Sequence, residues 1–147
     1  MLSGIHPILT GDLLAALDRL GHGDELVVAD ANFPAHRLGA GVVDLPGLGS
    51  PVVVQAIRTV VPLDGYEGAA VLLMAAEADD RPPVQVDLVE AAAVDDPSRV
   101  EELERFAFYD RAARAALVVR TGELRPYGNL ILRKGVVNAY VANGPAR

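Results

Sequence analysis

The chain has 147 residues, a length that suits one domain, and its 20 acidic and 13 basic side chains give a formal net charge of −7. This acidic balance argues against nucleic acid and anionic membranes as partners, because both are bound through clusters of Lys and Arg. The sequence contains no Cys, no apolar run near the roughly 18 residues of a membrane span and no signal-peptide pattern, which excludes disulfides and Cys-ligated metal centres and predicts a soluble cytoplasmic protein.

The N-terminal third of the chain predicts a helix followed by two strands. Thr10 or Asp12 can cap a helix whose leucines share one face. Residues 25–30 form an apolar run that is typical of a short buried strand, and a second brief strand is predicted over 42–45.

The middle of the chain predicts a second helix and a central strand. Ser50 and Pro51 resemble an N-cap followed by Pro at the first helical position, so we expect a helix over 50–61. Residues 69–75 form an apolar strand with no polar face, which indicates a strand covered on both sides. Residues 77–83 carry charge and two prolines and are predicted to form a surface loop.

The last third of the chain completes an alternation of strands and helices. Residues 84–93 are ambiguous between strand and helix, and we favour helix. Ser98 and Glu101 fit a capping box, which predicts that the longest helix of the chain begins here. Closely spaced strands over 116–120 and 130–133 suggest an antiparallel element at one edge of an otherwise parallel sheet. The alternation predicts a layered α/β domain.

Two chemical motifs are suggested by the glycines and histidines, and neither is supported. The segment Gly21-His22-Gly23 superficially resembles a dinucleotide-binding fingerprint, but it follows a helix, precedes a strand and lacks the third Gly. The spacing of His6, His22 and His36 matches no metal-ligand pattern. Metal binding by scattered His and carboxylate groups stays open at this point.

His22 and Asp30 flank the first predicted strand and are candidates for chemistry. His22 lies in a glycine-bounded loop, and its imidazole can exchange a proton near neutral pH. Asp30 lies at the carboxyl end of the strand, the edge at which open α/β sheets usually bind ligands. A polar helix cap at His22 and a turn-forming Asp30 explain the same pattern, and spacing alone favours that interpretation.

A second polar cluster precedes the last predicted strand. Tyr127, Gly128 and Asn129 combine hydroxyl and amide groups that suit a neutral polyol, and Tyr can stack on a sugar face. Ordinary turn chemistry is the alternative interpretation. Arg105 lies among aromatic residues of the predicted long helix, where it can also be a solvated helix charge.

Six segments, in this order and spacing, resemble the RbsD/FucU family of sugar mutarotases over residues 1–137. They are residues 21–25, 29–36, 105–112, 121–123, 127–129 and 134–136. The fold of that family is a Rossmann-like three-layer α/β/α sandwich. The resemblance therefore implies a single domain over 1–147, with 138–147 as a C-terminal tail.

The resemblance also implies an enzyme that interconverts the α and β anomers of a free monosaccharide, with no cofactor and no metal. His22 matches the proton donor of the family. The residues that match sugar-binding positions are Asp30, Arg105, Tyr127, Gly128 and Asn129. The alternative is a non-catalytic sugar-binding or assembly subunit with the same fold.

The branch of the family and the expected assembly follow from the same comparison. Residues 33–36 and 105–109 resemble the fucose branch more than the ribose branch, although Asn32 replaces a His that is usual in that branch. Family members form rings, often decamers, with sites where neighbouring subunits meet, and the 51% apolar content agrees with buried intersubunit surface. We therefore expect a homo-oligomer, which the resemblance implies to be a decamer, with Tyr127 and Asn129 reaching the pocket of a neighbouring chain.

Overall fold

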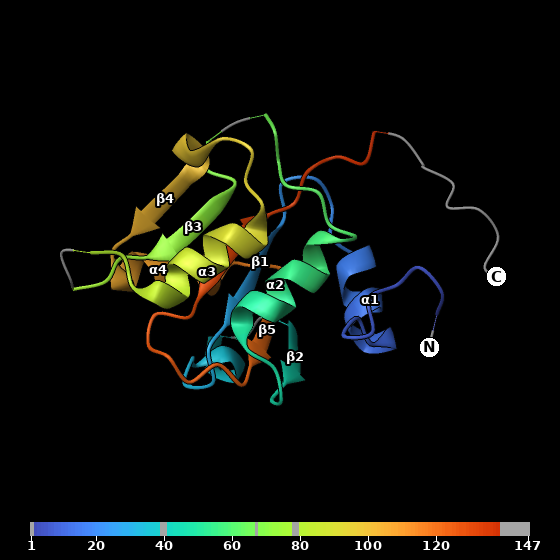
Figure 1. The fold of residues 1–147 in the computed structure, drawn as a ribbon, viewed down its shortest axis with the longest axis horizontal. Helices are drawn as coiled ribbons and strands as arrows, with labels where there is room; N and C mark the ends of the chain where they lie inside the picture. The colour runs from blue at the N-terminus through green and yellow to red at the C-terminus, as the bar shows by residue number, and fades with distance from the viewer. Residues whose placement is uncertain (1, 39–40, 67, 78–79, 139–147) are drawn as a thin grey trace.

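The predicted alternation of strands and helices forms one mixed sheet with helices on both faces (Figure 1). The computed structural model describes residues 2–38, 41–66, 68–77 and 80–138, so the predicted tail lies outside the described residues except for its first residue. The strands described are β1 (Glu25–Ala29), β2 (Gly41–Leu45), β3 (Val71–Met74), β4 (Val100–Leu103), β5 (Leu117–Thr121) and β6 (Leu130–Arg133). The helices described are α1 (Gly11–Asp18), α2 (Ser50–Arg58), α3 (Pro83–Ala92) and α4 (Arg105–Ala112), with the 3-10 helices η1 (Ala35–Leu38) and η2 (Pro97–Arg99).

The strand order β2-β5-β1-β6-β3-β4 confirms a mainly parallel sheet and corrects the position of its antiparallel strand. Strand β6 runs antiparallel to both β1 and β3, so it lies inside the sheet and not at an edge. The reason is burial: Leu130, Ile131 and Leu132 are almost inaccessible to solvent and need a strand on each side and a helix layer on each face. The loop over 122–129 carries the chain past β1.

Side chains of the inner strands alternate between two separate cores, which confirms the three-layer sandwich. Leu26 and Val28 of β1 face the core that α1, α2 and α3 cover. Val27 and Ala29 face the opposite core, where Phe108 of α4 is the largest fully buried side chain. This alternation is the period of two that a strand imposes on its side chains.

The predicted long helix from Ser98 is wrong. Residues 100–103 form β4, an edge strand that pairs in parallel with β3 and exposes its two glutamates. Helix α4 begins only after Glu104, whose carboxylate accepts hydrogen bonds from the backbone amides of Phe106 and Ala107. It has eight residues and is shorter than α3, which has ten.

Helix α1 has a side-chain cap at its start, whereas α2 has none. The Thr10 hydroxyl accepts a hydrogen bond from the Leu13 amide, as predicted for a helix N-cap. The N-cap of α2 is Gly49 and not the predicted Ser50. The Ser50 hydroxyl is buried and instead donates to the backbone oxygen of Gly128 at 2.7 Å, so it ties the start of α2 to a distant loop.

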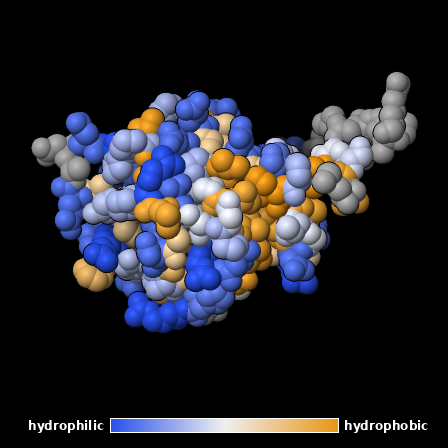
Figure 2. Space-filling model, turned by 60° about the horizontal axis from the view of Figure 1, so that its bottom comes forward, coloured by the Kyte–Doolittle hydropathy of each residue, from blue (hydrophilic) through white to orange (hydrophobic). Residues whose placement is uncertain are grey.

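One face of the molecule carries an apolar surface. Figure 2 shows hydrophobic residues gathered over the region where α1, α2 and β2 lie. Side chains of this region that remain partly or largely exposed include Leu14, Val43, Leu45, Leu48 and Val52. Among the described residues, no helix is both long and apolar enough to cross a membrane.

Candidate active site

A pocket of about 310 Å³ lies where the carboxyl ends of β1 and β3 meet the amino end of α4 and the loop before β6. Its volume is at the small end of the roughly 300–1,000 Å³ that small-molecule sites occupy. Four polar residues that line it come from three separate segments: Asp30, Asn32, Arg105 and Asn129. Parallel strands ending at one edge explain this convergence, since each is followed by a loop at the same edge.

Asp30 and Asn129 form the buried floor of the pocket. The Asn129 side-chain amide donates to Oδ2 of Asp30 at 2.7 Å, and its Oδ1 accepts the backbone amide of Asp30 at 2.7 Å. The amide of Asn32 donates to the other carboxylate oxygen, as in an Asx turn, and thereby ends β1. Asn129 therefore lines the same pocket as Asp30 of its own chain, and its contribution to a site shared with a neighbouring chain stays a prediction.

Arg105 brings the positive charge of the site from the first turn of α4. Its guanidinium lies 5.8 Å from the ring centroid of Tyr109, one helical turn further along. A hydrogen bond with the Tyr109 side chain raises the pKa of Arg105, and the neighbouring Tyr127 acts in the same direction. The spacing of four residues between Arg105 and Tyr109 is the signal that could have identified Tyr109 as part of the site.

Tyr127 also lines the pocket of its own chain, from a strained loop. Its backbone φ of +63° lies in the left-handed region that favours glycine. The next residue, Gly128, leaves no space for a side chain, because a Cβ there would approach Cγ of Glu123 at 2.7 Å. Gly128 therefore has a packing role and holds Tyr127 and Asn129 in place without offering a side chain to a ligand.

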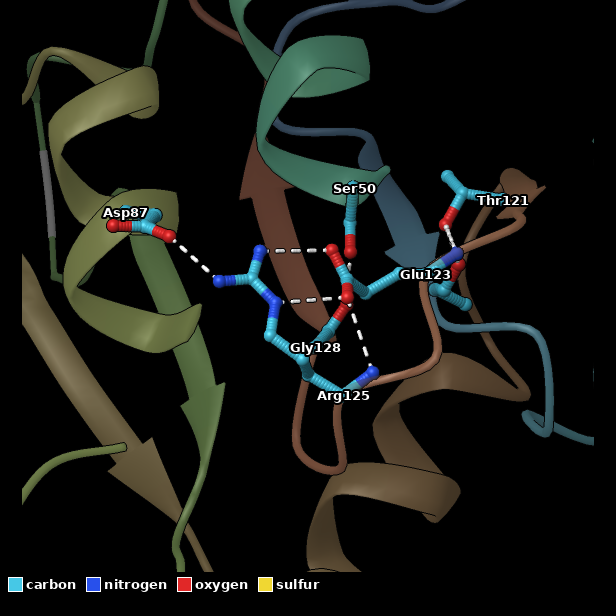
Figure 3. A network of polar contacts seen from close by, with 7 residues as sticks. Ser50, Asp87, Thr121, Glu123, Arg125 and Gly128 are labelled. Carbon is cyan, nitrogen blue, oxygen red and sulfur yellow. Dashed lines mark hydrogen bonds and ion pairs between the residues drawn. The ribbon is translucent and has the colours of Figure 1, made fainter. Parts of the chain in front are cut away.

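A network of charged groups fixes this loop to the helix layer (Figure 3). The buried Glu123 carboxylate receives two guanidinium nitrogens of Arg125, each at 2.9 Å. The same guanidinium donates to Asp87 of α3 at 2.8 Å. Ser50 holds the loop to α2 through Gly128, as described above. Paired charges of this kind restrict a loop more than neutral hydrogen bonds do, so the polar groups of the pocket are preorganised.

The remaining walls of the pocket are aromatic or apolar. Phe33, Met74 and Tyr109 line it beside Pro126. The Phe33 ring packs against Tyr109 with centroids 5.6 Å apart. Met74 is the last residue of β3, and that position at the carboxyl end of a parallel strand could have marked it in advance. Pro126 carried only a turn signal in the sequence. Hydroxyl-binding groups facing apolar walls suit a neutral, polyhydroxylated ring.

His22 lies apart from the other predicted site residues. His22 precedes β1, whereas Asp30 follows β1. The strand between them has five residues and spans about 16 Å, at roughly 3.3 Å per residue. The imidazole is half exposed and contacts Asp64 and Tyr66. Within one chain the structure thus brings together Asp30, Arg105 and the 127–129 cluster, and leaves His22 at the opposite end of β1.

Among the described residues, no group of three or more potential metal ligands is present.

Comparison with known proteins gives one consistent result. The sequence model of the RbsD / FucU transport protein family matches residues 3–137. The chain is 43% identical over 140 residues to the L-fucose mutarotase of Actinobacillus pleuropneumoniae, covering 92% of this chain and 97% of that relative. The crystal structure of FucU from Bifidobacterium longum matches with a TM-score of 0.84 and 40% identity, over 91% of this chain and 99% of that one. The fucose mutarotase of Streptococcus pneumoniae in complex with L-fucose matches with a TM-score of 0.85 and 34% identity, over 92% and 99%.

Proposed function

This chain belongs to the RbsD/FucU family, and on that premise we propose that it is a sugar mutarotase, an isomerase that interconverts the α and β anomers of a free monosaccharide. L-fucose or a closely related sugar is the substrate. The observation that carries the proposal is the pocket, where a carboxylate, a guanidinium, a phenol and an amide converge beside apolar walls. The fold is shared with a fucose mutarotase whose structure contains L-fucose.

Mutarotation moves two protons and leaves the oxidation state unchanged. The C1 hydroxyl loses its proton to a basic group or water while the ring oxygen gains one, and the bond between C1 and the ring oxygen breaks. The open-chain aldehyde turns about its C1–C2 bond, and the ring closes on the other face. One acid and one base near neutral pH suffice, each contributing about 10²–10⁴-fold, so the reaction calls for no cofactor.

The pocket residues hold the sugar in this proposal. Asp30 accepts a sugar hydroxyl, and Arg105 donates to another. Asn129 keeps Asp30 oriented through the two hydrogen bonds described above. The Tyr127 ring covers one sugar face, and its hydroxyl adds a further hydrogen bond. The apolar wall formed by Met74 and its neighbours suits the methyl group of a 6-deoxy sugar such as L-fucose.

The proton donor in this proposal is His22, and it comes from a second subunit. The imidazole cannot reach the pocket of its own chain, since β1 lies between them. A complete site in this proposal combines the pocket of one chain with His22 of another, and so requires a homo-oligomer; the family resemblance implies a decamer. The apolar surface over α1, α2 and β2 offers area for such contacts (Figure 2). A cytoplasmic location completes the proposal.

One observation favours a second candidate function. A chain that acted alone would have the pocket without the proton donor, because His22 lies at the other end of β1. Such a chain would bind a sugar without interconverting its anomers. It would then be a sugar-binding or assembly subunit with the same fold.

Magnetisation transfer between the anomeric protons of a free sugar distinguishes the two functions. We expect the exchange rate of L-fucose to rise in proportion to added protein, and to rise less for D-ribose and D-galactose. His22→Ala should lose most of this rate, whereas His36→Ala, a change at an exposed histidine outside the site, should retain it. Binding of L-fucose without accelerated exchange would support the binding subunit and contradict the mutarotase.

A further inference from the structure

Asp64 is a buried carboxylate outside the pocket, and it lies against His22. Its side chain is 1% exposed, whereas that of His22 is 48% exposed. Oδ1 lies 3.3 Å from Nε2 of His22 and accepts the Tyr66 amide at 3.0 Å, while Oδ2 lies 3.1 Å from Nε of Arg133. A carboxylate is costly to bury, so a charge placed here needs these partners.

The carboxylate is ionised at neutral pH. The Tyr66 amide, the His22 ring and the Arg133 guanidinium hold the pKa of Asp64 below its usual value of 3.8, against the opposing effect of burial. An ionised carboxylate has no proton to donate and acts only as an acceptor. The hydrogen atom between Asp64 and His22 therefore belongs to the imidazole.

The loop that carries Asp64 and the turn that carries His22 are held by the same stretch of chain. Leu63 forms a β-bridge with Lys134, and the Asp64 amide donates to the backbone oxygen of Arg133 at 2.9 Å. The amide of Gly23 donates to the backbone oxygen of Lys134 at 2.8 Å. Because both segments are fixed to the end of β6, the backbone holds residues 22 and 64 close to each other.

This contact selects one tautomer of His22. A neutral imidazole has one N–H donor and one acceptor nitrogen, and the facing carboxylate requires the N–H at Nε2. Among the described residues, Nδ1 of His22 has no hydrogen-bond partner, so it is the nitrogen left for a substrate. The Tyr66 ring stands edge-on to the imidazole, with centroids 5.4 Å apart at 66°.

We propose that Asp64 is the positioning residue for His22: its carboxylate accepts the Nε2 proton, fixes the tautomer and orientation of the imidazole, and leaves Nδ1 as the atom that exchanges a proton with the sugar. This inference rests on the proposed function of His22 as proton donor. The Nδ1 proton of the imidazolium passes to the ring oxygen as the bond to C1 breaks. The neutral imidazole takes a proton back at Nδ1 when the ring closes.

The tautomer can be measured directly in the unmodified protein. Long-range ¹H–¹⁵N correlation spectra of the histidine rings, recorded above the imidazole pKa, should show His22 with a protonated Nε2 and an unprotonated Nδ1. A proton on Nδ1 in the wild-type protein would overturn the proposal. This measurement needs no variant and no activity, so it distinguishes failure of the Asp64 proposal from failure of the mutarotase proposal.

Kinetics of Asp64→Asn then test the consequence for the reaction. We expect the saturated exchange rate to fall roughly 10–100-fold, the effect typical of losing a group that orients a functional histidine, with the KM for sugar changed less than about twofold. The matched control is Asp12→Asn, at an exposed aspartate of α1, which should behave as wild type. In a His22→Ala background, Asp64→Asn should have no further effect. A loss of similar size in that background, or a raised KM at an unchanged rate, would show that Asp64 does not act through His22.

Discussion

Tyr127 is the residue at which the pocket departs most from relaxed backbone geometry. A left-handed conformation at a non-glycine residue costs about 1–3 kcal/mol and persists where the surroundings determine it. Here the surroundings are Gly128, whose backbone oxygen accepts the Ser50 hydroxyl, and the ion pair between Glu123 and Arg125. These contacts therefore hold the loop in a conformation that is unfavourable for the isolated segment, and they place the Tyr127 ring in the wall of the pocket.

Tyr127→Phe separates sugar binding from proton transfer at this position. The change keeps the ring and deletes a hydroxyl, whose hydrogen bond to a neutral ligand is worth about 0.5–1.5 kcal/mol. We expect the KM for sugar to rise by at most about tenfold, while the exchange rate at saturating sugar is retained. Anomer exchange measured over a range of sugar concentrations gives both quantities. A saturated rate reduced as far as in His22→Ala would instead place the hydroxyl in the proton relay.

At the scale of elements, the loop between β5 and β6 links site geometry to stability through Glu123. The guanidinium of Arg125 holds the pKa of this buried carboxyl below its usual value of 4.5, although burial opposes the shift. A carboxyl whose pKa is lower in the folded state stabilises the fold above the unfolded pKa, and that contribution is lost as the pH falls through the folded pKa.

Glu123→Gln should therefore lower the free energy of unfolding at pH 7 and flatten its dependence on pH below about 4.5. Urea unfolding at a series of pH values from 7 to 3 measures both effects. The exposed Glu90→Gln on α3 is a control for the general effect of removing a carboxylate. An acid dependence of Glu123→Gln as steep as that of wild type would contradict the stabilising role of the ion pair.

The start of the same loop has no room for a side chain. A Cβ on Gly122 would lie 1.9 Å from the backbone oxygen of Pro46. A Cβ on Gly47, the residue after Pro46, would meet nothing within 4 Å. We expect Gly122→Ala to destabilise the fold by at least about 1–3 kcal/mol, because backbone must move to relieve the clash, and Gly47→Ala to leave stability nearly unchanged. Thermal unfolding of the pair tests this, and equal melting temperatures would contradict it.

Local sequence patterns predicted the elements whose residue types reflect how deeply they are buried. The apolar runs within 25–30 and 69–75 became β1 and β3, because fully buried strands contain few polar residues. Residues 100–103 were wrongly predicted as helix, because their pattern fits a capped helix and only the pairing with β3 makes them a strand. The pocket could be predicted only in part, since β1 and β6 meet through a long-range pairing that no local pattern encodes.

At the scale of the whole molecule, the separation of His22 from the pocket makes a prediction about assembly. If each site combines two chains, a His22→Ala subunit, which lacks the proton donor, and an Asp30→Asn subunit, which lacks the carboxylate of the pocket, can complement each other. Random mixing at equal amounts would restore activity at about a quarter of the sites. Subunits should be unfolded and refolded together, and their anomer exchange compared with that of the separate variants. Mixtures without activity, or a fully active 15.5 kDa monomer by light scattering, would contradict a shared site.

The central position of β6 has a consequence for how the chain folds. This strand is the last of the described strands in chain order, yet it joins β2, β5 and β1 on one side of the sheet to β3 and β4 on the other. During synthesis, these two groups of strands are not hydrogen-bonded to each other until β6 has left the ribosome. Until then the edges of β1 and β3 that later pair with β6 stay unpaired. Closure then joins segments that are distant along the chain, a slow class of folding event in which exposed edges invite aggregation. A chain that ends before residue 130 would therefore have two partial sheets with unpaired strand edges, which are prone to aggregation, rather than a smaller stable fold.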